Sequence, residues 1–527
     1  MHAIHSTIKN SLGGTMHTKI FSATTIGVDA HTVEVEVDLS LGMMNFFIVG
    51  LPDTAIKESR QRIQTALKNC GIKLPDRRIT VNLAPADLKK EGTLFDLPIA
   101  IGILQAAKLL QIAPSFLEET LFMGELSLDG SIKPIKGALA IAYDAKKLGR
   151  SRLIVPLENA QEAALIKDIE VFGVKHLVDL IAFLRGEKPM TPVAHSMPNH
   201  IQQKTDLDFS QVKGQEQAKR ALTIAAAGNH NILFIGPPGS GKTMLAKRLA
   251  TIMPTMSFDQ ILQASKVYSI SGKLKGNPVV SQRPFRAPHH TISQAGLVGG
   301  GSYPQPGEIS LAHNGILFLD ELTEFKRDTL EVLRQPLENK MVNIARAQQS
   351  ITFPASFLLV AALNPCPCGY YGDKKKDCTC SDQQINKYLD KLSGPLLDRI
   401  DLQIHVPGIE YDTIKDKTNS GQTSATMQEK IKAATSAQKI RFKNTSVDNA
   451  TMSADQVEQF CILTVEAEQL MKKVFEKLHL SMRGYHKVLK VARTIADLEG
   501  SSALAIPHIK EALMYRSVDH YFERKRT

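Results

Sequence analysis

Cysteine is scarce in this sequence, with six residues among 527, which excludes a scaffold held together by disulfides. Long apolar runs are missing too, because no stretch approaches the roughly 18–20 apolar residues of a membrane span. The first fifteen residues contain one lysine and no apolar run, so they lack the core of a secretory signal. We therefore expect a cytoplasmic protein without a membrane partner, in which residues 1–15 are a disordered leader and Met16 could be the true start.

The composition is that of an ordinary globular protein, with 43% hydrophobic and 22% charged residues. A chain of 527 residues exceeds the size of a single hydrophobic core, so two or three domains are expected. The formal net charge of +11 suggests a polyanionic partner such as nucleic acid. Many basic proteins bind no DNA, so this signal needs support from motifs.

Residues 16–185 have the pattern of a mixed α/β domain, in which short strands alternate with helices. Residues 186–208 contain three prolines and almost no apolar periodicity, which is typical of a linker. The alternation resumes in a core at 209–410 and gives way to helical patterns at 411–527. Strands are predicted at 32–39, 46–50, 79–83 and 152–156; helices are predicted at 55–68, 97–110, 137–147, 457–478, 485–499 and 507–521.

A phosphate-binding loop follows the apolar strand 232–235 and precedes a helical pattern, which is the context that such a loop requires. Its glycines let backbone N–H groups turn towards phosphates, and the next helix presents its positive N-terminus to the same anion. Lys242 should reach the β- and γ-phosphates of ATP, and the Thr243 hydroxyl should bind Mg²⁺. The loop consists of Gly236, Pro237, Pro238, Gly239, Ser240, Gly241, Lys242 and Thr243.

An acidic pair follows the apolar tetrad at 316–319. A buried parallel strand would deliver Asp320 and Glu321 at its carboxyl end, where α/β sheets bind ligands. Asp320 would complete the Mg²⁺ shell, and Glu321 would orient and deprotonate the attacking water. A further apolar strand at 357–363 ends at Asn364.

These motifs and several longer segments resemble the AAA+ ATPases of the magnesium-chelatase-like group, specifically the ComM/YifB type. The resemblance covers the chain from about Met16 to its end. Besides GPPGSGKT, it is carried by PFRAPHHTIS (284–293), GGGSYPQPGEISLAHNGILFLDEL (299–322), NPCPCG (364–369), SGPLLDRIDL (393–402) and LSMRGYHKVLKVARTIADL (480–498). It implies an α/β fold with a parallel AAA+ P-loop core and a C-terminal helical lid.

The resemblance also implies roles for single residues. Asn364 matches the sensor that sits between the γ-phosphate and the catalytic water, and Arg399 matches the arginine finger that acts on a neighbouring subunit. Arg483 matches the second sensor, which reaches the γ-phosphate from the lid, and Arg493 is a weaker candidate. A finger that acts in trans implies a homo-oligomeric ring, and a hexamer is the usual AAA+ arrangement.

Four cysteines, Cys366, Cys368, Cys378 and Cys380, fall within fifteen residues. Four thiolates suit a closed, structural Zn²⁺ site. The C-x-C spacing is less typical than C-x₂₋₄-C, so reduced cysteines packed in a charged loop are the alternative.

The insert before the acidic strand contains basic and aromatic residues, which would suit a nucleic-acid backbone. Arg286 and Tyr303 are its candidate DNA contacts; a packed structural insert is the alternative. The neighbouring His289 and His290 are not expected to hold a metal, because adjacent histidine side chains need not converge.

Residues 123–162 resemble the Lon protease domain, a fold of the S5 type, and the Lon-like domain of the RadA recombination protein. The proteases use a Ser–Lys pair. In this chain the lysine position is occupied by Leu139, and the serine position falls near Leu94, in the segment EGTLFDLP (91–98). Without a nucleophile or a base, no acyl chemistry is expected. The domain is predicted to serve in DNA binding or assembly.

Three functions fit these features. The resemblance implies an ATP-dependent helicase that acts on single-stranded and branched DNA and drives branch migration during natural transformation. A chelatase-type motor that remodels a protein partner is the alternative. A scaffold that only binds ATP is disfavoured by Glu321, Asn364 and Arg399.

Overall fold

The computed structural model describes residues 16–43, 45–195, 206–274, 277–301, 304–345, 350–373, 375–408, 422–443 and 447–516. The expected leader at 1–15 lies outside these ranges. The chain divides into two compact units: Met1–Ile201 with Ser265–Val280, and Gln202–Ala264 with Ser281–Thr527. The inclusion of Ser265–Val280 in the first unit was not evident from the sequence. Within the described ranges, every helix is too short or too polar to span a bilayer.

A seven-stranded sheet forms the framework of the first unit, in the order β3-β4-β2-β1-β5-β8-β9. The long strands β1 and β2 pair antiparallel, with Ile20 opposite Val35. Both side chains are fully buried, and so are Val33 and Val37 on the same face. The strands of this unit are β1 (Met16–Ile26), β2 (Asp29–Ser40), β3 (Asn45–Val49), β4 (Arg78–Ala84), β5 (Thr120–Phe122), β6 (Glu125–Leu126), β7 (Ile132–Lys133), β8 (Arg152–Pro156) and β9 (Glu170–Val174).

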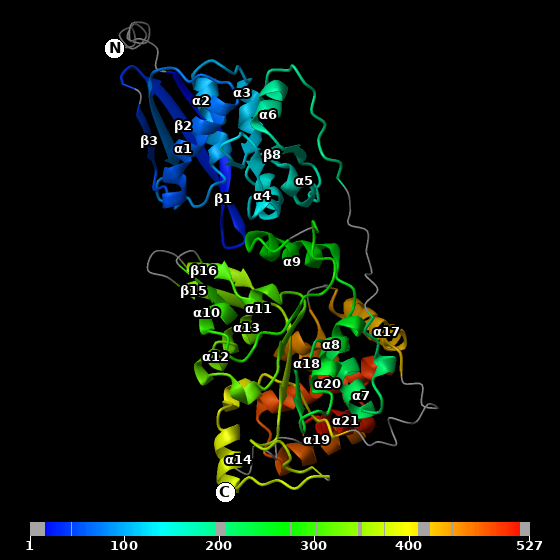
Figure 1. Ribbon diagram of the computed structural model, residues 1–527. Coiled ribbons are helices and arrows are strands. Elements are labelled where there is room, and N and C mark those ends of the chain that lie inside the picture. The colour runs from blue at the N-terminus through cyan, green and yellow to red at the C-terminus, as the bar shows by residue number, and fades with distance from the viewer. Residues whose placement is uncertain are drawn as a thin grey trace, which may run out of the picture. The chain divides into compact units, whose positions relative to one another are not determined.

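Helix α2, which is largely buried, packs against β1 and β2 (Figure 1). Its Gly102 lies so close to β2 that a Cβ there would come within 2.6 Å of Cγ2 of Val37. The helix therefore packs directly on the strand. The helices of this unit are α1 (Thr54–Asn69), α2 (Asp96–Ala106), α3 (Pro114–Glu119), α4 (Ala138–Ala145), α5 (Leu157–Ala163) and α6 (Leu177–Leu184).

The second unit contains a five-stranded parallel sheet in the order β11-β14-β17-β10-β18. All residues of β10, β14 and β17 are buried, as the continuous apolar runs predicted. The five strands are β10 (Ile232–Ile235), β11 (Phe285–Arg286), β14 (Ile316–Leu319), β17 (Leu358–Leu363) and β18 (Leu402–His405). Two separate ribbons are β12 (Gly299–Gly300) with β13 (Gln305–Pro306), and β15 (Met341–Ala345) with β16 (Ser350–Pro354).

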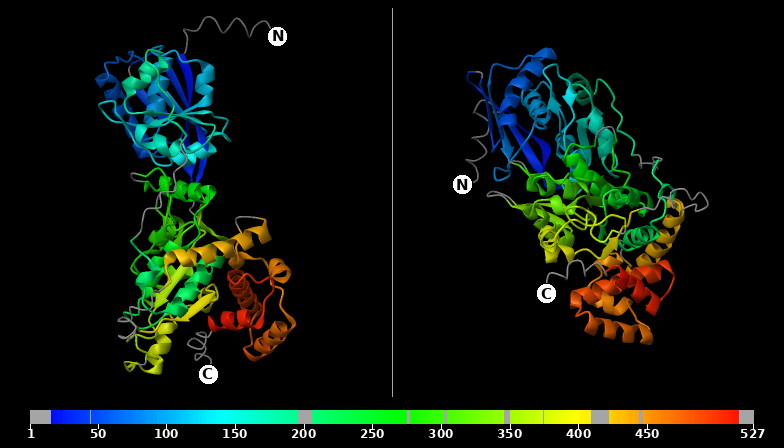
Figure 2. Two further views of the ribbon diagram at one scale, coloured as in Figure 1. Left: turned by 90° about the vertical axis from the view of Figure 1, so that its right-hand side faces the viewer. Right: turned by 60° about the horizontal axis from the view of Figure 1, so that its bottom comes forward.

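The C-terminal helices pack beside this α/β core, as the orange and red segments show in Figure 2. The helices of the second unit include α7 (Glu216–Gly228), α8 (Lys242–Ile252), α10 (Gln294–Val298), α11 (Glu308–Leu311), α12 (Arg327–Glu331), α13 (Arg334–Asn339), α14 (Asp382–Leu389), α15 (Gly394–Leu397), α17 (Ser424–Phe442), α18 (Ala454–Phe460), α19 (Val465–Lys477), α20 (Met482–Leu498) and α21 (Ile506–Met514). Helix α9 (Phe258–Ile270) begins in the second unit, and its residues from Ser265 onward belong to the first unit.

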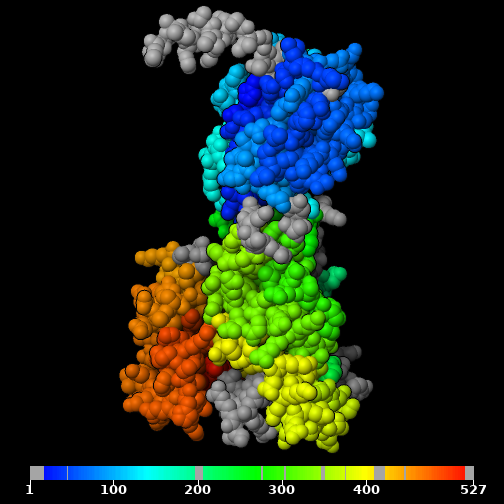
Figure 3. All heavy atoms as spheres, turned by 90° about the vertical axis from the view of Figure 1, so that its left-hand side faces the viewer, coloured from blue at the N-terminus to red at the C-terminus, as the bar shows by residue number. Residues whose placement is uncertain are grey.

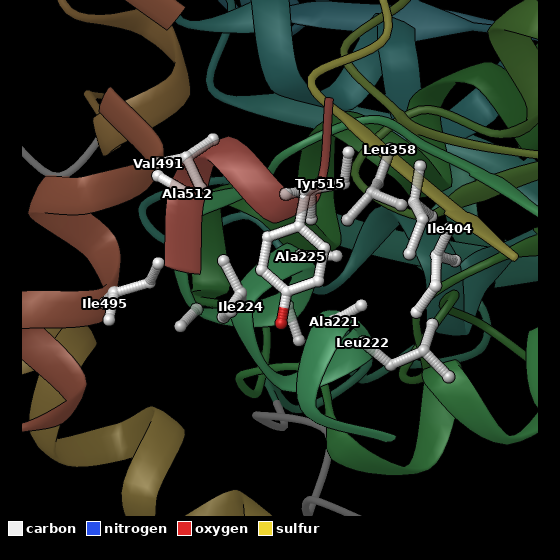
Figure 4. Packing of buried hydrophobic residues seen from close by; sticks show 14 of the residues in the cluster. Ala221, Leu222, Ile224, Ala225, Leu358, Ile404, Val491, Ile495, Ala512 and Tyr515 are labelled. Atoms are coloured by element: carbon white, nitrogen blue, oxygen red, sulfur yellow. The ribbon is translucent and has the colours of Figure 1, made fainter. Parts of the chain in front are cut away.

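One hydrophobic core joins the helical lid to the sheet (Figure 4). Ala221 and Ala225 of α7 lie between Ile404 of the sheet and Ile495 of α20. Tyr515, which is 7% exposed, packs among them. The lid is therefore built onto the core by apolar burial.

Two expectations about single elements were wrong. The range 457–478 holds α18 and α19 rather than one helix, because Thr464 caps a new helix by accepting the N–H of Ala467. Strand β1 was missed because its residues 20–24 are all buried and include polar residues, such as Ser22 and Thr24. Its sequence therefore shows no apolar alternation.

Candidate ATP site and cysteine cluster

Three neighbouring strands of the second unit end at the same edge of the sheet. The phosphate-binding loop follows β10, Asn364 follows β17, and Asp320 and Glu321 follow β14. The register aligns Ile235 with Leu363 and Leu319 with Ala361, so the residues that follow lie close together. The structure thus brings the two halves of the predicted site together.

The Lys242 ammonium group lies in a cradle of oxygens. It donates to the carbonyls of Gly236 and Pro237, at 2.7 and 2.9 Å, and to Oδ1 of Asn364 at 3.2 Å. Burial lowers its pKa, while the charges of Asp320 and Glu321 oppose that shift. These oxygens stabilise the ammonium where phosphate oxygens of a nucleotide could take their place.

Thr243 and Asp320 approach each other as a Mg²⁺ site would require. The Thr243 hydroxyl donates to Oδ2 of Asp320 at 2.6 Å, so both oxygens face one position. Hydroxyl and carboxylate oxygens are ligands that Mg²⁺ prefers. Among the described residues, the buried Ser240 hydroxyl in the same loop has no hydrogen-bond partner. The residues present therefore fit a Mg²⁺ ion with a bound phosphate.

Glu321 is held by a partner that the sequence did not reveal. Its backbone has φ of 51°, in the left-handed region that is rare for residues other than glycine. Its Oε2 lies 3.2 Å from Nδ1 of His290, which follows the neighbouring strand β11. His290 also stacks on His289, with ring centroids 4.1 Å apart. His290 thus contacts the carboxylate, and the adjacency of β11 and β14 was the signal that sequence reasoning missed.

Arg399 and Arg483 meet at one carboxylate, that of Glu338 in α13. The guanidinium of Arg399 lies 2.5 Å from it, and that of Arg483 lies 3.0 Å from it. The carbonyl of Arg399 accepts a hydrogen bond from Asn231, immediately before β10 begins. The phosphate-binding loop lies at the opposite end of that strand, so Arg399 is at the far edge of the sheet. The structure therefore brings the two arginines together, but not to Lys242.

Arg493 belongs to a buried network inside the lid. Its side chain is 1% exposed, pairs with Asp497 at 3.0 Å and donates to the carbonyls of Ser501 and Ser502. Every nitrogen of its guanidinium has a partner within the lid. The weaker candidacy of Arg493 for the nucleotide site stays a prediction.

The four clustered cysteines converge on one point. All four sulfur atoms lie within 4.8 Å of one another. Sγ of Cys366 is 3.3 Å from that of Cys368 and 3.7 Å from that of Cys378. Tetrahedral Zn²⁺ with Zn–S bonds of about 2.3 Å would place its sulfurs ~3.8 Å apart. The backbone N–H of Tyr370 foremost lowers the pKa of Cys368 to about 5, which favours a thiolate. The donor set fits zinc.

Of the two candidate DNA contacts, Arg286 and Tyr303, the structure describes only the first. Arg286 forms a two-point ion pair with Glu308, at 2.6 and 2.7 Å, so its guanidinium is engaged inside the protein. Tyr303 lies outside the described residues. DNA contact by either residue stays a prediction.

The positions that would carry protease chemistry in the first unit are apolar. Leu139 is fully buried in α4, and Leu94 is partly buried against the core. These side chains pack the interior and provide neither nucleophile nor base.

Comparisons with known proteins agree with this architecture. The family model described as magnesium chelatase, subunit ChlI, matches residues 208–414. Models of subunit ChlI of Mg-chelatase and of its C-terminal part match 35–159 and 421–516. The chain is 44% identical to competence protein ComM of Haemophilus influenzae over 95% of this chain and 97% of that protein. It is 42% identical to the uncharacterized protein YifB of Salmonella typhimurium over 94% and 96%. Lon protease 2 of Bacillus subtilis is 32% identical over 28% of this chain and 25% of its own length.

Proposed function

The chain belongs to the magnesium-chelatase-like family of competence protein ComM and YifB, and we propose that it is an ATP-dependent DNA motor that promotes branch migration during natural transformation. The family indicates an AAA+ ATPase that uses ATP and Mg²⁺ and a role in competence like that of ComM. The observation that carries the proposal is the convergence of the phosphate-binding loop, the acidic pair and Asn364 at one sheet edge. The net charge of +11 supports a DNA substrate, and the proposal includes a cytoplasmic location.

The site residues divide the work of ATP hydrolysis. Lys242 exchanges its carbonyl partners for the β- and γ-phosphates. Thr243 and Asp320 hold Mg²⁺, which supplies positive charge to the phosphate oxygens when bound. Glu321 takes a proton from the attacking water after leaving His290, and Asn364 positions that water beside Lys242.

The position of Arg399 and Arg483 supports a ring. Strand β10 has four residues, which at about 3.3 Å each separate Arg399 from the phosphate-binding loop by ~13 Å. An extended arginine side chain reaches only roughly 7 Å from its Cα. We therefore assign both arginines to the nucleotide of a neighbouring subunit, in a homo-oligomer that we take to be a hexamer.

We further infer that Cys366, Cys368, Cys378 and Cys380 hold one structural Zn²⁺. The spacing of their sulfur atoms supports this assignment. Four protein ligands leave no open coordination position, so the ion would take no part in hydrolysis. Metal analysis of the purified protein tests it, with one zinc per chain as the expected result.

The first experiment measures ATP hydrolysis with and without branched DNA, together with strand displacement of a Holliday-type junction. Wild type is compared with Lys242→Ala. We expect DNA to stimulate hydrolysis, the junction to move, and both activities to be lost in the variant. Binding to DNA should weaken steeply with salt, because phosphate contacts release counterions.

Two results would contradict the proposal. Junction movement by Lys242→Ala would separate the activity from the ATP site. Hydrolysis that no form of DNA changes would instead direct the search to a protein partner, as in the chelatase-type alternative.

A further inference from the structure

The cysteine cluster is joined directly to the ATP site. Cys366 lies two residues after Asn364, and the N–H of Gly369 donates to its carbonyl at 3.0 Å, which closes a tight turn at 366–369. Gly369 has φ of 86° and abuts the phosphate-binding loop. A Cβ on Gly369 would lie 2.6 Å from Cδ of Pro238 and 3.9 Å from Cγ of Asn364.

The other two cysteines connect this turn to helix α14. The N–H of Cys368 donates to Sγ of Cys380 at 3.4 Å, and Cys366 packs with Ile385 and Leu389 of α14. Ser381 caps this helix by accepting the N–H of Gln384. Figure 3 shows the yellow segment around α14 at the surface of the second unit. The four thiols thus lie between a surface helix and the turn that contacts Pro238.

We propose that this cysteine-bound turn positions the phosphate-binding loop and Asn364, so that nucleotide affinity depends on metal occupancy of the cysteines. The proposal rests on the ATPase function and the zinc site above. With four thiolates on one ion, the turn at 366–369 is fixed, and Gly369 limits where Pro238 can lie. Without that cross-link, the turn keeps only non-covalent contacts, such as the packing of Cys366 on α14, and both the loop and Asn364 lose a fixed neighbour.

The main test removes metal ligands that do not belong to the turn. The double variant Cys378→Ser/Cys380→Ser should lose its zinc and bind a fluorescent ATP analogue about tenfold more weakly, since small misplacements of binding groups have large effects. Turnover should fall as well. A fraction of unfolded protein would lower apparent kcat but leave the dissociation constant unchanged, so the dissociation constant separates positioning from misfolding.

A second variant tests the contact itself without touching a ligand. Gly369→Ala should keep its zinc and still bind the ATP analogue more weakly, because its Cβ would collide with Pro238. Gly500→Ala is the matched control: Gly500 has φ of 70°, but nothing lies within 4 Å of its Cβ position. The effect of Gly369→Ala should shrink in a Pro238→Ala background, which lacks the two ring atoms involved.

Several outcomes would overturn the inference. A zinc-free double variant that binds the ATP analogue like wild type would refute it while leaving the ATPase proposal intact. If the effects of Gly369→Ala and Pro238→Ala on the dissociation constant were strictly additive, the contact between these residues would not be how the turn acts on the loop. Purified wild type that contained no zinc would contradict the zinc site on which the inference rests. Wild type that hydrolyses no ATP would contradict the proposed function instead.

Discussion

Replacement of Arg399 by alanine should stop ATP turnover without weakening nucleotide binding by the same chain. The strand between Arg399 and the phosphate-binding loop spans ~13 Å, which is beyond the reach of one side chain. An arginine finger accounts for ~10³–10⁵ of the hydrolysis rate, so kcat should fall by that order. The dissociation constant of an ATP analogue, measured with the isolated chain, should stay unchanged.

Mixed rings give the decisive assay. Arg399→Ala keeps Glu321, and Glu321→Gln keeps Arg399, so a mixture of the two inactive variants contains some complete sites. With random assembly at equal amounts, about a quarter of all sites combine an intact Glu321 with a neighbour's intact Arg399. Hydrolysis should therefore return to about a quarter of the wild-type rate if sites act independently. No recovery at any mixing ratio would refute action in trans.

The same design decides where Arg483 acts. If Arg399 and Arg483 both serve the neighbour's nucleotide, a mixture of Arg399→Ala and Arg483→Ala has no complete site, because every donor lacks one arginine. If Arg483 instead serves its own nucleotide, an Arg399→Ala chain beside an Arg483→Ala chain forms a complete site. The shared contact with Glu338 predicts no recovery. Recovery would show that the pair separates when the ring forms.

Three further predictions concern single residues. Glu321→Gln should keep ATP binding but lose ~10²–10⁴ of turnover in a steady-state assay, and normal turnover would refute its role as base. His290→Ala should raise hydrolysis measured without DNA, because it frees the Glu321 carboxylate, whereas His289→Ala should not; a loss in His290→Ala would mean that His290 positions Glu321 productively. Burial lowers the pKa of His313 to about 4, below its unfolded value. The free energy of unfolding therefore has its full value above pH ~6.5 and falls as the pH drops towards 4. Urea unfolding of the second unit should show a loss of ~2 kcal/mol at pH 5 that His313→Gln lacks.

The sequence was sufficient where the signal is local. The strand, the glycine-rich loop and the helix of the phosphate site are contiguous from Ile232 onward, and all were predicted in the right order. The apolar tetrad before Asp320 likewise predicted a buried strand. Convergence of the two motifs followed from the general behaviour of parallel sheets.

Contacts between distant segments could not be predicted. Arg483 and Glu338 are 145 residues apart, and nothing local to either residue indicates the other. The partnership of His290 with Glu321 depends on β11 lying next to β14, which is a property of the strand order. Strand β1 was missed because residues 20–24 are buried on both faces, which removes the alternation by which a half-buried strand is recognised.

A buried network explains how the two arginines keep their mutual position. His230, just before β10, lies 3.3 Å from Asp401 and 2.7 Å from the hydroxyl of Thr494 in α20. Burial alone would raise the pKa of Asp401, but the hydrogen bond with His230 and the charge of Lys487 lower it to about 2.

Asp401 follows Arg399 by two residues, and α20 carries Arg483 near its start. Lys487, also in α20, donates to the carbonyl of Ile400 at 3.2 Å. The segment with Arg399 and the helix with Arg483 are therefore fixed to the same end of β10. The two arginines should therefore keep their mutual position in the proposed ring, in which both act on the nucleotide of a neighbouring subunit.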